Sequence, residues 1–508
     1  MNDQKTLTRG VGAGISFALL LFAVFVVTFC GYDSFLRINY PRWDSSWFYM
    51  GGKAWMEGLV PYVDFADSKG PLLWFVYGIG YLITPNSFFG MYLLEILLYW
   101  GTFTLLYRSA LILTGDRRLS LFVAFLMPLA YFFPVIHNEM RAEDLCNILY
   151  ALTLYSVLKI KAGSGSPARY GFYMGLSAGC GILIKYNIGI ILMVPALGLI
   201  LWKIVDTKVF KGGWLSFLSA WIGGILTILV PLFICFLCYG NLRAFIDEYF
   251  LTTFQTVVNI GGESGSDGAV SMLRRITGGF NLRALYIILS CVSAVCALSK
   301  RLRLGKTGML AALWFLIALV LSVAMPWDYY LFNLAVFWIF MFAYVSKRWW
   351  RPERGANVIV GACVVALLAI APTSIMGNGE FHDVEIAQKH NAAENKIRDL
   401  ADEWLIRYGR RPTIAYLNMP DKGLHVKGGL LPGVKYWALQ TGASDQMMED
   451  HFNSVRERHP DFVVVGEGDV RSVKMLEEEG YGPPVMVDAT GSTKKSLESL
   501  YIFTKEKL

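Results

Sequence analysis

The sequence predicts a polytopic α-helical membrane protein, with about eleven transmembrane helices and a small α/β domain at the C-terminus. Three observations support this fold class. Of the 508 residues 55% are hydrophobic and only 17% are charged, whereas soluble domains are about 25% charged. Apolar residues occur in runs of about 17–25, the length of a membrane-crossing helix. Lysines and arginines cluster in short segments between these runs, as in cytoplasmic loops.

These basic clusters also predict how the chain threads the membrane. Residues 11–31 follow a basic start without a small-residue cleavage site, so we expect a retained first span and a cytoplasmic N-terminus. Residues 71–83 are too short for a full crossing and are expected to lie at the membrane interface. Further spans are expected at 89–113, 119–137, 145–161, 170–184, 188–203, 214–238, 282–299, 309–325, 329–345 and 356–375. The net charge of +7 is then explained by lysines and arginines in cytoplasmic loops. A nucleic-acid partner is not needed to explain it.

The odd number of spans places the C-terminal tail on the extracytoplasmic side of a plasma or inner membrane. We therefore expect a membrane domain at residues 1–376, with outer loops at 32–88 and 240–281, and a soluble domain at 377–508. Within the tail, "PTIAYLN" and "DFVVVGEG" read as buried strands. "ENKIRDLADEWLIRYG" and "SVKMLEEEGY" read as helices. This alternation predicts a small α/β domain.

Charged residues that interrupt the apolar pattern all fall on the predicted outer side. Ionisable groups at a membrane boundary are costly unless they are paired or solvated, so they mark a functional site by default. We expect an outward-facing cavity lined by carboxylates and two lysines. The residues concerned are Asp44, Asp64, Asp67, Lys69, His137, Glu139, Arg141, Glu143, Asp144, Lys185 and Asp328.

Several of these residues also have a structural explanation. Asp44 could cap a helix that starts there, and the negative charge of Asp144 suits the start of the following helix. Lys185 could extend its side chain to the membrane surface. Lys69 could anchor the chain at the interface. The sequence leaves these alternatives open.

The order of these residues resembles the GT-C superfamily of integral-membrane glycosyltransferases, especially the branch of the protein O-mannosyltransferases and the lipid A aminoarabinose transferase. The first outer loop of that branch has an acidic residue, an aromatic residue, a small-residue helix, G-x-x-P-Y, an aspartate and K-P-P-L. The matching parts of this chain are Asp44, Tyr49, Ala54, "GLVPYVD" at 58–64 and "KGPL" at 69–72. Later matches are "RAEDL" at 141–145, "GLSAGCGILIKYN" at 175–187 and "DYYLFNLAVFW" at 328–338.

The resemblance implies transfer of a hexose or pentose from a polyprenyl-phosphate donor to an acceptor hydroxyl in the cell envelope. Asp44 would be the general base, and Lys69 and Lys185 would meet the charge that develops on the leaving phosphate. The other expected substrate-binding residues are Asp64, Asp67, Arg141, Glu143, Asp144, Asp328 and Tyr329. Family members often have Asp-Glu where this chain has Asp44-Ser45, which leaves Asp64 or Asp67 open as the base. They have Lys-Pro-Pro where this chain has Lys69-Gly70-Pro71.

The sequence is compatible with more than one cofactor, acceptor and overall activity. The sequence indicates no definite cofactor; a divalent cation is one candidate, because carboxylates such as Glu143 and Asp144 suit magnesium or manganese. The acceptor could be a lipid, a glycan or a protein. Arg274 and Arg275 could assist from an outer loop, in which the glycine-rich residues 259–268 look like a lid. A transporter of a lipid or small anion is the alternative, but it predicts charges near the midplane and repeated halves. A polysaccharide polymerase or ligase is a second alternative.

Overall fold

The computed structural model describes residues 12–31, 33–37, 43–133, 140–205, 213–252, 282–323, 328–349, 384–439, 445–490 and 497–505. The chain forms two compact units, each built from separate stretches of sequence. Unit 1 contains Met1–Gly31, Leu94–Ile234 and Thr256–Ile375. Unit 2 contains Tyr32–Leu93, Cys235–Gln255 and Met376–Leu508. The boundary predicted at residue 376 lies outside the described residues.

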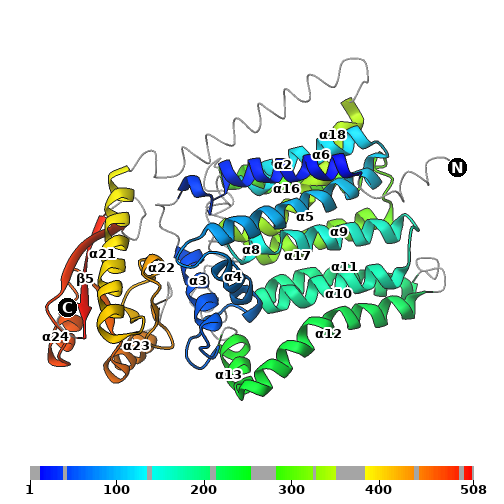
Figure 1. The fold of residues 1–508 in the computed structure, drawn as a ribbon. Helices are drawn as coiled ribbons and strands as arrows, with labels where there is room; N and C mark the ends of the chain where they lie inside the picture. The colour runs from blue at the N-terminus through cyan, green and yellow to red at the C-terminus, as the bar shows by residue number, and fades with distance from the viewer. Residues whose placement is uncertain are drawn as a thin grey trace. The chain divides into compact units, whose positions relative to one another are not determined.

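Unit 1 is a bundle of apolar helices that run side by side (Figure 1). Its elements are α2 (Ala13–Cys30), α5 (Phe89–Thr114, from Leu94 onward), α6 (Arg117–Leu126), α7 (Pro128–Tyr131), α8 (Ala142–Leu145), α9 (Asn147–Lys161), α10 (Pro167–Ile184), α11 (Tyr186–Val205), α12 (Trp214–Tyr239, up to Ile234), α16 (Leu282–Ala297), α17 (Lys306–Val323), the 3₁₀ helix η3 (Asp328–Phe337) and α18 (Trp338–Trp349). In the described part of the chain, six helices are long and apolar enough to cross a membrane by themselves.

The prediction of a multi-pass helical membrane protein is confirmed, and most predicted spans coincide with helices. Two predicted spans, 119–137 and 329–345, contain two elements each, because α6 is followed by α7 and η3 by α18. The predicted span at 145–161 corresponds to α9. The predicted span at 356–375 lies outside the described residues. The total of eleven spans therefore stays a prediction.

Glycines allow two of the unit 1 helices to approach very closely. Gly171, Gly175 and Gly179 recur every four residues on one face of α10. A Cβ atom on Gly175 would lie 1.9 Å from the main-chain oxygen of Trp221 in α12. A Cβ atom on Gly224 would lie 2.3 Å from the main-chain oxygen of Phe172. Small residues at such crossings let membrane helices gain contacts between their backbones.

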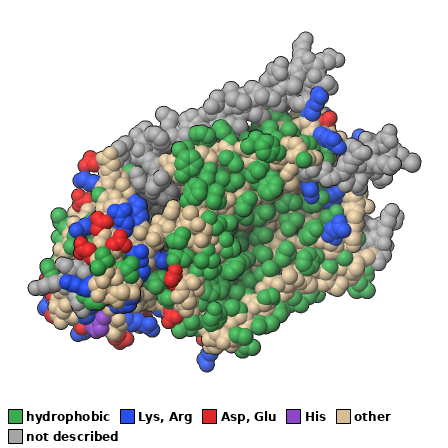
Figure 2. Space-filling model, in the orientation of Figure 1, with side chains coloured by type: hydrophobic (Ala, Val, Ile, Leu, Met, Phe, Trp, Pro, Cys, Tyr) green, Lys and Arg blue, Asp and Glu red, His purple; other side chains and the backbone are tan. Residues whose placement is uncertain are grey.

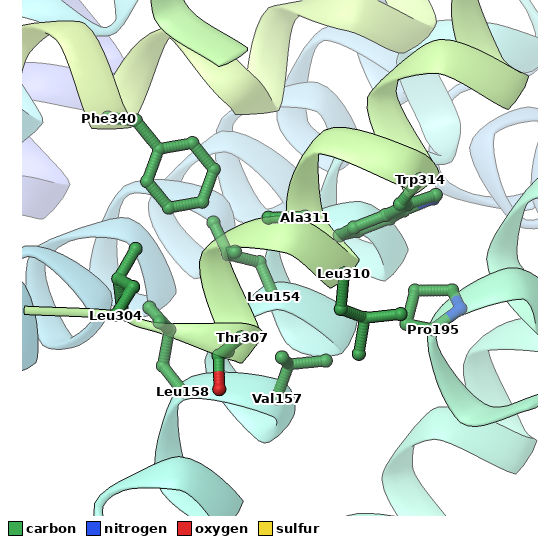
Figure 3. A pocket seen from close by; sticks show the side chains of 10 residues that line it. All are labelled: Leu154, Val157, Leu158, Pro195, Leu304, Thr307, Leu310, Ala311, Trp314 and Phe340. Atoms are coloured by element: carbon green, nitrogen blue, oxygen red, sulfur yellow. The ribbon is translucent and has the colours of Figure 1, made fainter. Parts of the chain in front are cut away.

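The interior of unit 1 is closely packed, while its surface is apolar. A cavity of about 10 Å³ between α9, α11, α17 and α18 is lined almost entirely by apolar side chains, including Leu154, Leu310 and Trp314 (Figure 3). Such a site offers too few polar partners for an ordered water molecule. Hydrophobic side chains cover the outer surface of the helices in Figure 2. On α12 the exposed residues include Leu215, Ile222, Leu226, Val230 and Ile234, as expected for a lipid-facing helix.

Unit 2 begins with a helical hairpin of α3 (Trp43–Met56) and α4 (Pro71–Ile83). Residues 71–83 thus form the short helix that the sequence predicts; its position at a membrane interface stays a prediction. The two helices touch at glycines, because a Cβ atom on Gly52 would lie 2.5 Å from the main-chain nitrogen of Gly78. The unit also includes the short helices η1 (Phe35–Arg37) and α13 (Leu242–Phe245) and the π-helical turn η2 (Ile246–Thr252).

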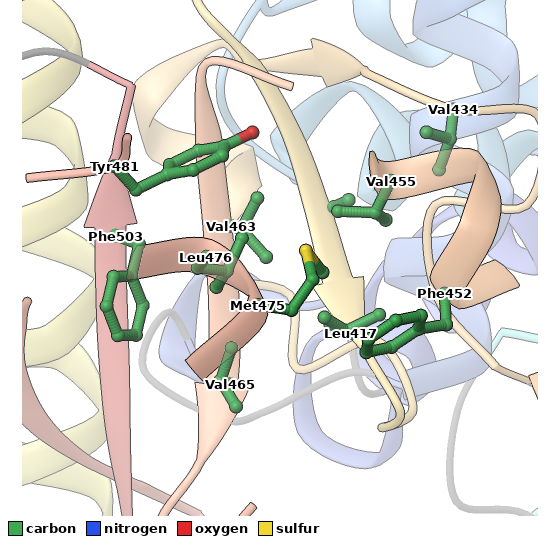
Figure 4. Packing of buried hydrophobic residues seen from close by; sticks show 11 residues of the cluster. Leu417, Val434, Phe452, Val455, Val463, Val465, Met475, Leu476, Tyr481 and Phe503 are labelled. Carbon is green, nitrogen blue, oxygen red and sulfur yellow. The ribbon is translucent and has the colours of Figure 1, made fainter. Parts of the chain in front are cut away.

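The tail, which belongs to unit 2, is a small α/β domain, as predicted. Its elements are α21 (Val384–Tyr408), β1 (Thr413–Leu417), α22 (His425–Gly428), β2 (Leu431–Pro432), α23 (Asp445–Arg458), β3 (Phe462–Gly466), α24 (Val470–Glu478), β4 (Val485–Thr490) and β5 (Leu497–Thr504). The sheet order is β2-β1-β3-β5-β4. Strand β1 pairs in parallel with β2 and β3, whereas β5 is antiparallel to β3 and β4. Buried residues of β1, β3, α23 and α24, among them Leu417 and Met475, form the core (Figure 4).

Candidate functional site

The two ends of the unit 1 bundle differ in their charged residues. The 15 residues of α9 span about 22 Å, so its first and last residues lie at opposite ends. Lysines and arginines gather at the end where α9 finishes and α10 begins (Figure 2). The predicted site residues of unit 1 lie instead at the start of α9 and the end of α10. We call this second end the polar end.

A buried ion pair lies at the polar end. Lys185 directly follows α10, and its main-chain N–H donates to the oxygen of Gly181. Its Nζ atom lies 2.6 Å from Oε1 of Glu143 in α8. Lys185 is only 7% exposed and Glu143 only 2% exposed. Lys185 therefore points into protein and contacts a carboxylate, rather than extending to a surface.

Two tyrosines of η3 cover the cations at this end. The Nζ atom of Lys185 lies 3.8 Å from the ring centroid of Tyr330, and the guanidinium carbon of Arg141 lies 4.0 Å from that of Tyr329. The two rings stack with centroids 4.8 Å apart. A cation over an aromatic face is attracted by the ring quadrupole. Sequence reasoning included Tyr329 but missed Tyr330, although the two residues are adjacent.

The acidic residues beside this cluster make further local contacts. The main-chain N–H of Arg141 donates to Oδ2 of Asp144 at 3.2 Å, so Asp144 caps the start of α8. Asp328 forms an ion pair with Arg283, with 2.5 Å between Oδ1 and Nη1. Sequence reasoning missed Arg283. The available signal was its position at the start of a span, directly after a predicted outer loop.

In unit 2 the predicted site residues lie on α3 and in the loop that joins α3 to α4. Asp44 is the second residue of α3 and is half-buried. Asp64 closes a turn, since its Oδ2 accepts a hydrogen bond from the N–H of Val60 at 2.7 Å. Asp67 is buried and accepts from the N–H of Ser68 at 2.5 Å. The Nζ atom of Lys69 donates to the hydroxyl of the same serine at 3.1 Å.

The Pro-Tyr pair in the middle of this loop has a structural role. Tyr62 is buried in a left-handed conformation with φ of 65°, and its hydroxyl donates to the main-chain oxygen of Lys69 at 3.0 Å. The side-chain amide of Asn241, after α12, donates to the main-chain oxygen of Pro61 at 2.7 Å. These contacts fix the path of the loop through Asp67 and Lys69.

The predicted residues thus form two groups. In unit 1, the Lys185–Glu143 pair and Arg141 meet Tyr329 and Tyr330. In unit 2, Lys69 contacts Ser68, which also binds Asp67. That both groups share one cavity stays a prediction. His137, Glu139, Arg274, Arg275 and the glycine-rich residues 259–268 lie outside the described residues. Among the described residues, no group of three or more His, Cys, Asp or Glu side chains could hold a metal ion.

Comparisons with known proteins confirm the resemblance to the GT-C glycosyltransferases. The model of the dolichyl-phosphate-mannose-protein mannosyltransferase family matches residues 68–238. No curated protein matches the chain significantly. Among solved structures, ArnT from Cupriavidus metallidurans bound to undecaprenyl phosphate is 13% identical with a TM-score of 0.54, covering 97% of this chain and 98% of that one. Its apo form is 14% identical with a TM-score of 0.56, covering 96% of this chain and 97% of that one. These likenesses show a shared fold.

Proposed function

We propose that the chain is a membrane glycosyltransferase that moves a sugar from a polyprenyl-phosphate donor to an acceptor hydroxyl on the extracytoplasmic side. The fold shared with ArnT and the match to a mannosyltransferase family support this reaction class. ArnT has been crystallised with undecaprenyl phosphate, and a donor of that class fits an apolar helix bundle with Lys185 and Arg141 at its polar end. The transferred sugar would be a hexose or a pentose.

The main structural support for the proposal is the arrangement of Lys185 and Arg141 at the polar end of unit 1. Lys185 is held by Glu143 at 2.6 Å and by the ring of Tyr330, while Arg141 lies over Tyr329. Cations fixed in a site of low dielectric stabilise developing negative charge without a cost of reorganisation at the moment of reaction. The charge that develops in this reaction is on the leaving polyprenyl phosphate.

Asp44 is the proposed general base. Its carboxylate accepts the proton of the acceptor hydroxyl as that oxygen bonds to the anomeric carbon of the sugar. The bond between this carbon and the phosphate oxygen breaks, and its electron pair leaves with the polyprenyl phosphate. Lys69 and Lys185 bind that phosphate. Asp64 is the alternative base, although one of its oxygens also closes the turn with Val60.

The remaining predicted residues complete the substrate site. Glu143 orients Lys185, and Asp67, Asp144, Asp328 and Tyr329 bind donor or acceptor. The basic residues at the opposite end of unit 1 (Figure 2) support an orientation with that end in the cytoplasm, because lysines and arginines are retained on the cytoplasmic side. The N-terminus would then be cytoplasmic and the tail extracytoplasmic. A reporter fused after residue 508 tests this orientation, and a cytoplasmic reporter would contradict it.

The catalytic test combines binding and transfer in purified protein. Undecaprenyl phosphate serves as the binding probe, and the polyprenyl-phosphate sugars extracted from the producing cells serve as donors. An envelope extract from cells that lack the protein supplies the acceptor hydroxyls. Asp44→Asn should abolish transfer while undecaprenyl phosphate still binds. Full transfer by Asp44→Asn together with an inactive Asp64→Asn variant would assign the base to Asp64. A wild-type protein that neither binds the probe nor transfers sugar would overturn the function. Glycolipids and glycans that change when the protein is removed would identify the acceptor.

A further inference from the structure

One short segment of the tail contacts several parts of the outer loops within unit 2. We call residues 430–437 the tail bridge. At its first residue, the main-chain oxygen of Leu430 accepts a hydrogen bond from Nζ of Lys53 in α3 at 2.9 Å. Lys53 is only 2% exposed. A buried amine without an acceptor is costly, so this contact ties α3 to the tail bridge.

Lys435 connects the tail bridge to two further segments. Its main-chain oxygen accepts a hydrogen bond from the N–H of Ala66 at 2.9 Å. Its Nζ atom forms an ion pair with Glu248 of η2. The hydroxyl of Tyr436 donates to the other carboxylate oxygen of Glu248 at 2.6 Å. Hydrogen bonds to an ionised carboxylate are stronger than those between neutral groups, and Glu248 is largely shielded from solvent.

The last residue of the tail bridge packs against the helix that carries Asp44. The indole of Trp437 lies 4.6 Å from that of Trp47, measured between ring centroids. Residues three apart are neighbours on a helix surface, so Trp47 is next to Asp44 on α3. The tail bridge therefore contacts α3 at two points along its length.

These contacts are made by residues that lie close in the chain to those to which we assign catalysis and phosphate binding. Ala66 directly precedes Asp67 and lies three residues before Lys69. The loop at residues 57–70 has no regular helix or strand in the structure, so its conformation depends on hydrogen bonds within the loop and on contacts from outside it. Ordering each residue of a loop costs entropy. A catalytic group that moves by about 1 Å can lose about 100-fold in rate.

We propose that the tail bridge is a positioning element of the active site, in which Glu248 and Lys435 hold the Asp67–Lys69 turn and Lys53 holds α3. The tail then acts as scaffold for the first outer loop. This inference rests on the proposed function, because it gives Asp44 and Lys69 their roles. Glu248 and Lys435 touch no reacting atom and act through the main chain at Ala66.

The test compares Glu248→Gln and Lys435→Met with the wild-type protein. Loss of the ion pair should speed hydrogen exchange in the peptide that contains Ala66. It should also weaken undecaprenyl phosphate binding and lower kcat by about ten-fold, since misplaced groups lose rate steeply. Lys435→Arg keeps the charge and should restore these properties. Glu449→Gln is the matched control, because it breaks an exposed ion pair of the tail with Arg471 and should change nothing.

The possible outcomes separate this inference from the function itself. If the wild-type protein transfers sugar while both variants keep wild-type exchange and kcat, the positioning role is wrong. Faster exchange with an unchanged kcat would also overturn it. If the wild-type protein transfers no sugar, the proposed function fails independently of the exchange result. A role in stability alone would lower the amount of folded protein and its melting temperature, but the kcat of the remaining folded protein would be unchanged.

Discussion

The ammonium nitrogen of Lys185 lies 2.6 Å from Oε1 of Glu143, and both side chains are buried. The two residues come from the end of α10 and from α8. Removing two charges from water costs about as much as their attraction returns, so such a pair is weak evidence for a role in stability. Anion binding is a better explanation for the pair, since Glu143 keeps the cation of Lys185 fixed beside the stacked tyrosines.

The Lys185–Glu143 pair allows folding and binding to be tested separately. Lys185→Met leaves Glu143 as an unpaired buried charge, which should lower the free energy of unfolding by about 3–5 kcal/mol. The double variant Lys185→Met/Glu143→Gln removes both charges and should recover most of the melting temperature in detergent. It should still bind undecaprenyl phosphate more weakly than the wild type. Recovery of both properties would show that Lys185 is purely structural.

The tyrosine rings of η3 should contribute to the same binding step. Tyr330→Leu removes the aromatic face 3.8 Å from Nζ of Lys185. A cation–π contact is worth about 0.5–2 kcal/mol, so we expect undecaprenyl phosphate binding to weaken several-fold, as measured by titration. Tyr330→Phe keeps the ring and is the control. Equal loss in both variants would instead assign the effect to the hydroxyl.

The glycine contact between α10 and α12 predicts a change in stability without a change in chemistry. A Cβ atom at Gly175 would lie 1.9 Å from a main-chain oxygen of α12, so Gly175→Ala must push the helices apart. We expect a clearly lower melting temperature. Gly223→Ala, on α12 itself, meets nothing within 4 Å and should be neutral or slightly stabilising, because alanine favours helix. Equal melting temperatures for the two variants would contradict the packing.

Local sequence patterns predicted most elements, and contacts between distant residues account for the rest. The short helix at 71–83 and the strands β1 and β3 could be predicted because hydrophobic runs and flanking residues define them. The pairs of Lys185 with Glu143 and Arg283 with Asp328 join residues far apart in the chain, and no local pattern encodes them. The strands β4 and β5 were missed, because β4 is half-exposed and charged residues interrupt the apolar pattern of both.

For the site, too, local patterns predicted single residues but not the contacts between distant ones. The sequence identified Glu143 and Lys185 as separate charged residues at the ends of spans, but their pairing depends on how α8 and α10 pack. Lys53 gave no signal, since a lysine inside a glycine-rich helix resembles a surface residue. Only the folded tail supplies its acceptor at Leu430.

Lys53 should give the stability of the protein a pH dependence. Burial, with a further contribution from Arg411, lowers the pKa of Lys53 to about 7, although Glu57 opposes the shift. Below pH 7 the folded protein contains a buried ammonium and bears its full cost. Between pH 7 and about 10.4, the usual pKa of lysine, the unfolded chain binds a proton that the folded protein has lost. The free energy of unfolding contributed by this group therefore rises with pH across that window.

The variant Lys53→Met lacks the titrating amine, so the comparison isolates this effect. The melting temperature of the wild type minus that of Lys53→Met, measured in detergent, should increase from pH 7 to pH 9. Lys474→Met is the control, because Lys474 is exposed and has only a weak ion pair with Glu478 at 3.9 Å; its difference from wild type should not vary with pH. A constant difference for Lys53→Met would mean that Lys53 stays charged in the folded protein. Its contact with the tail bridge would then be that of an ammonium throughout this range.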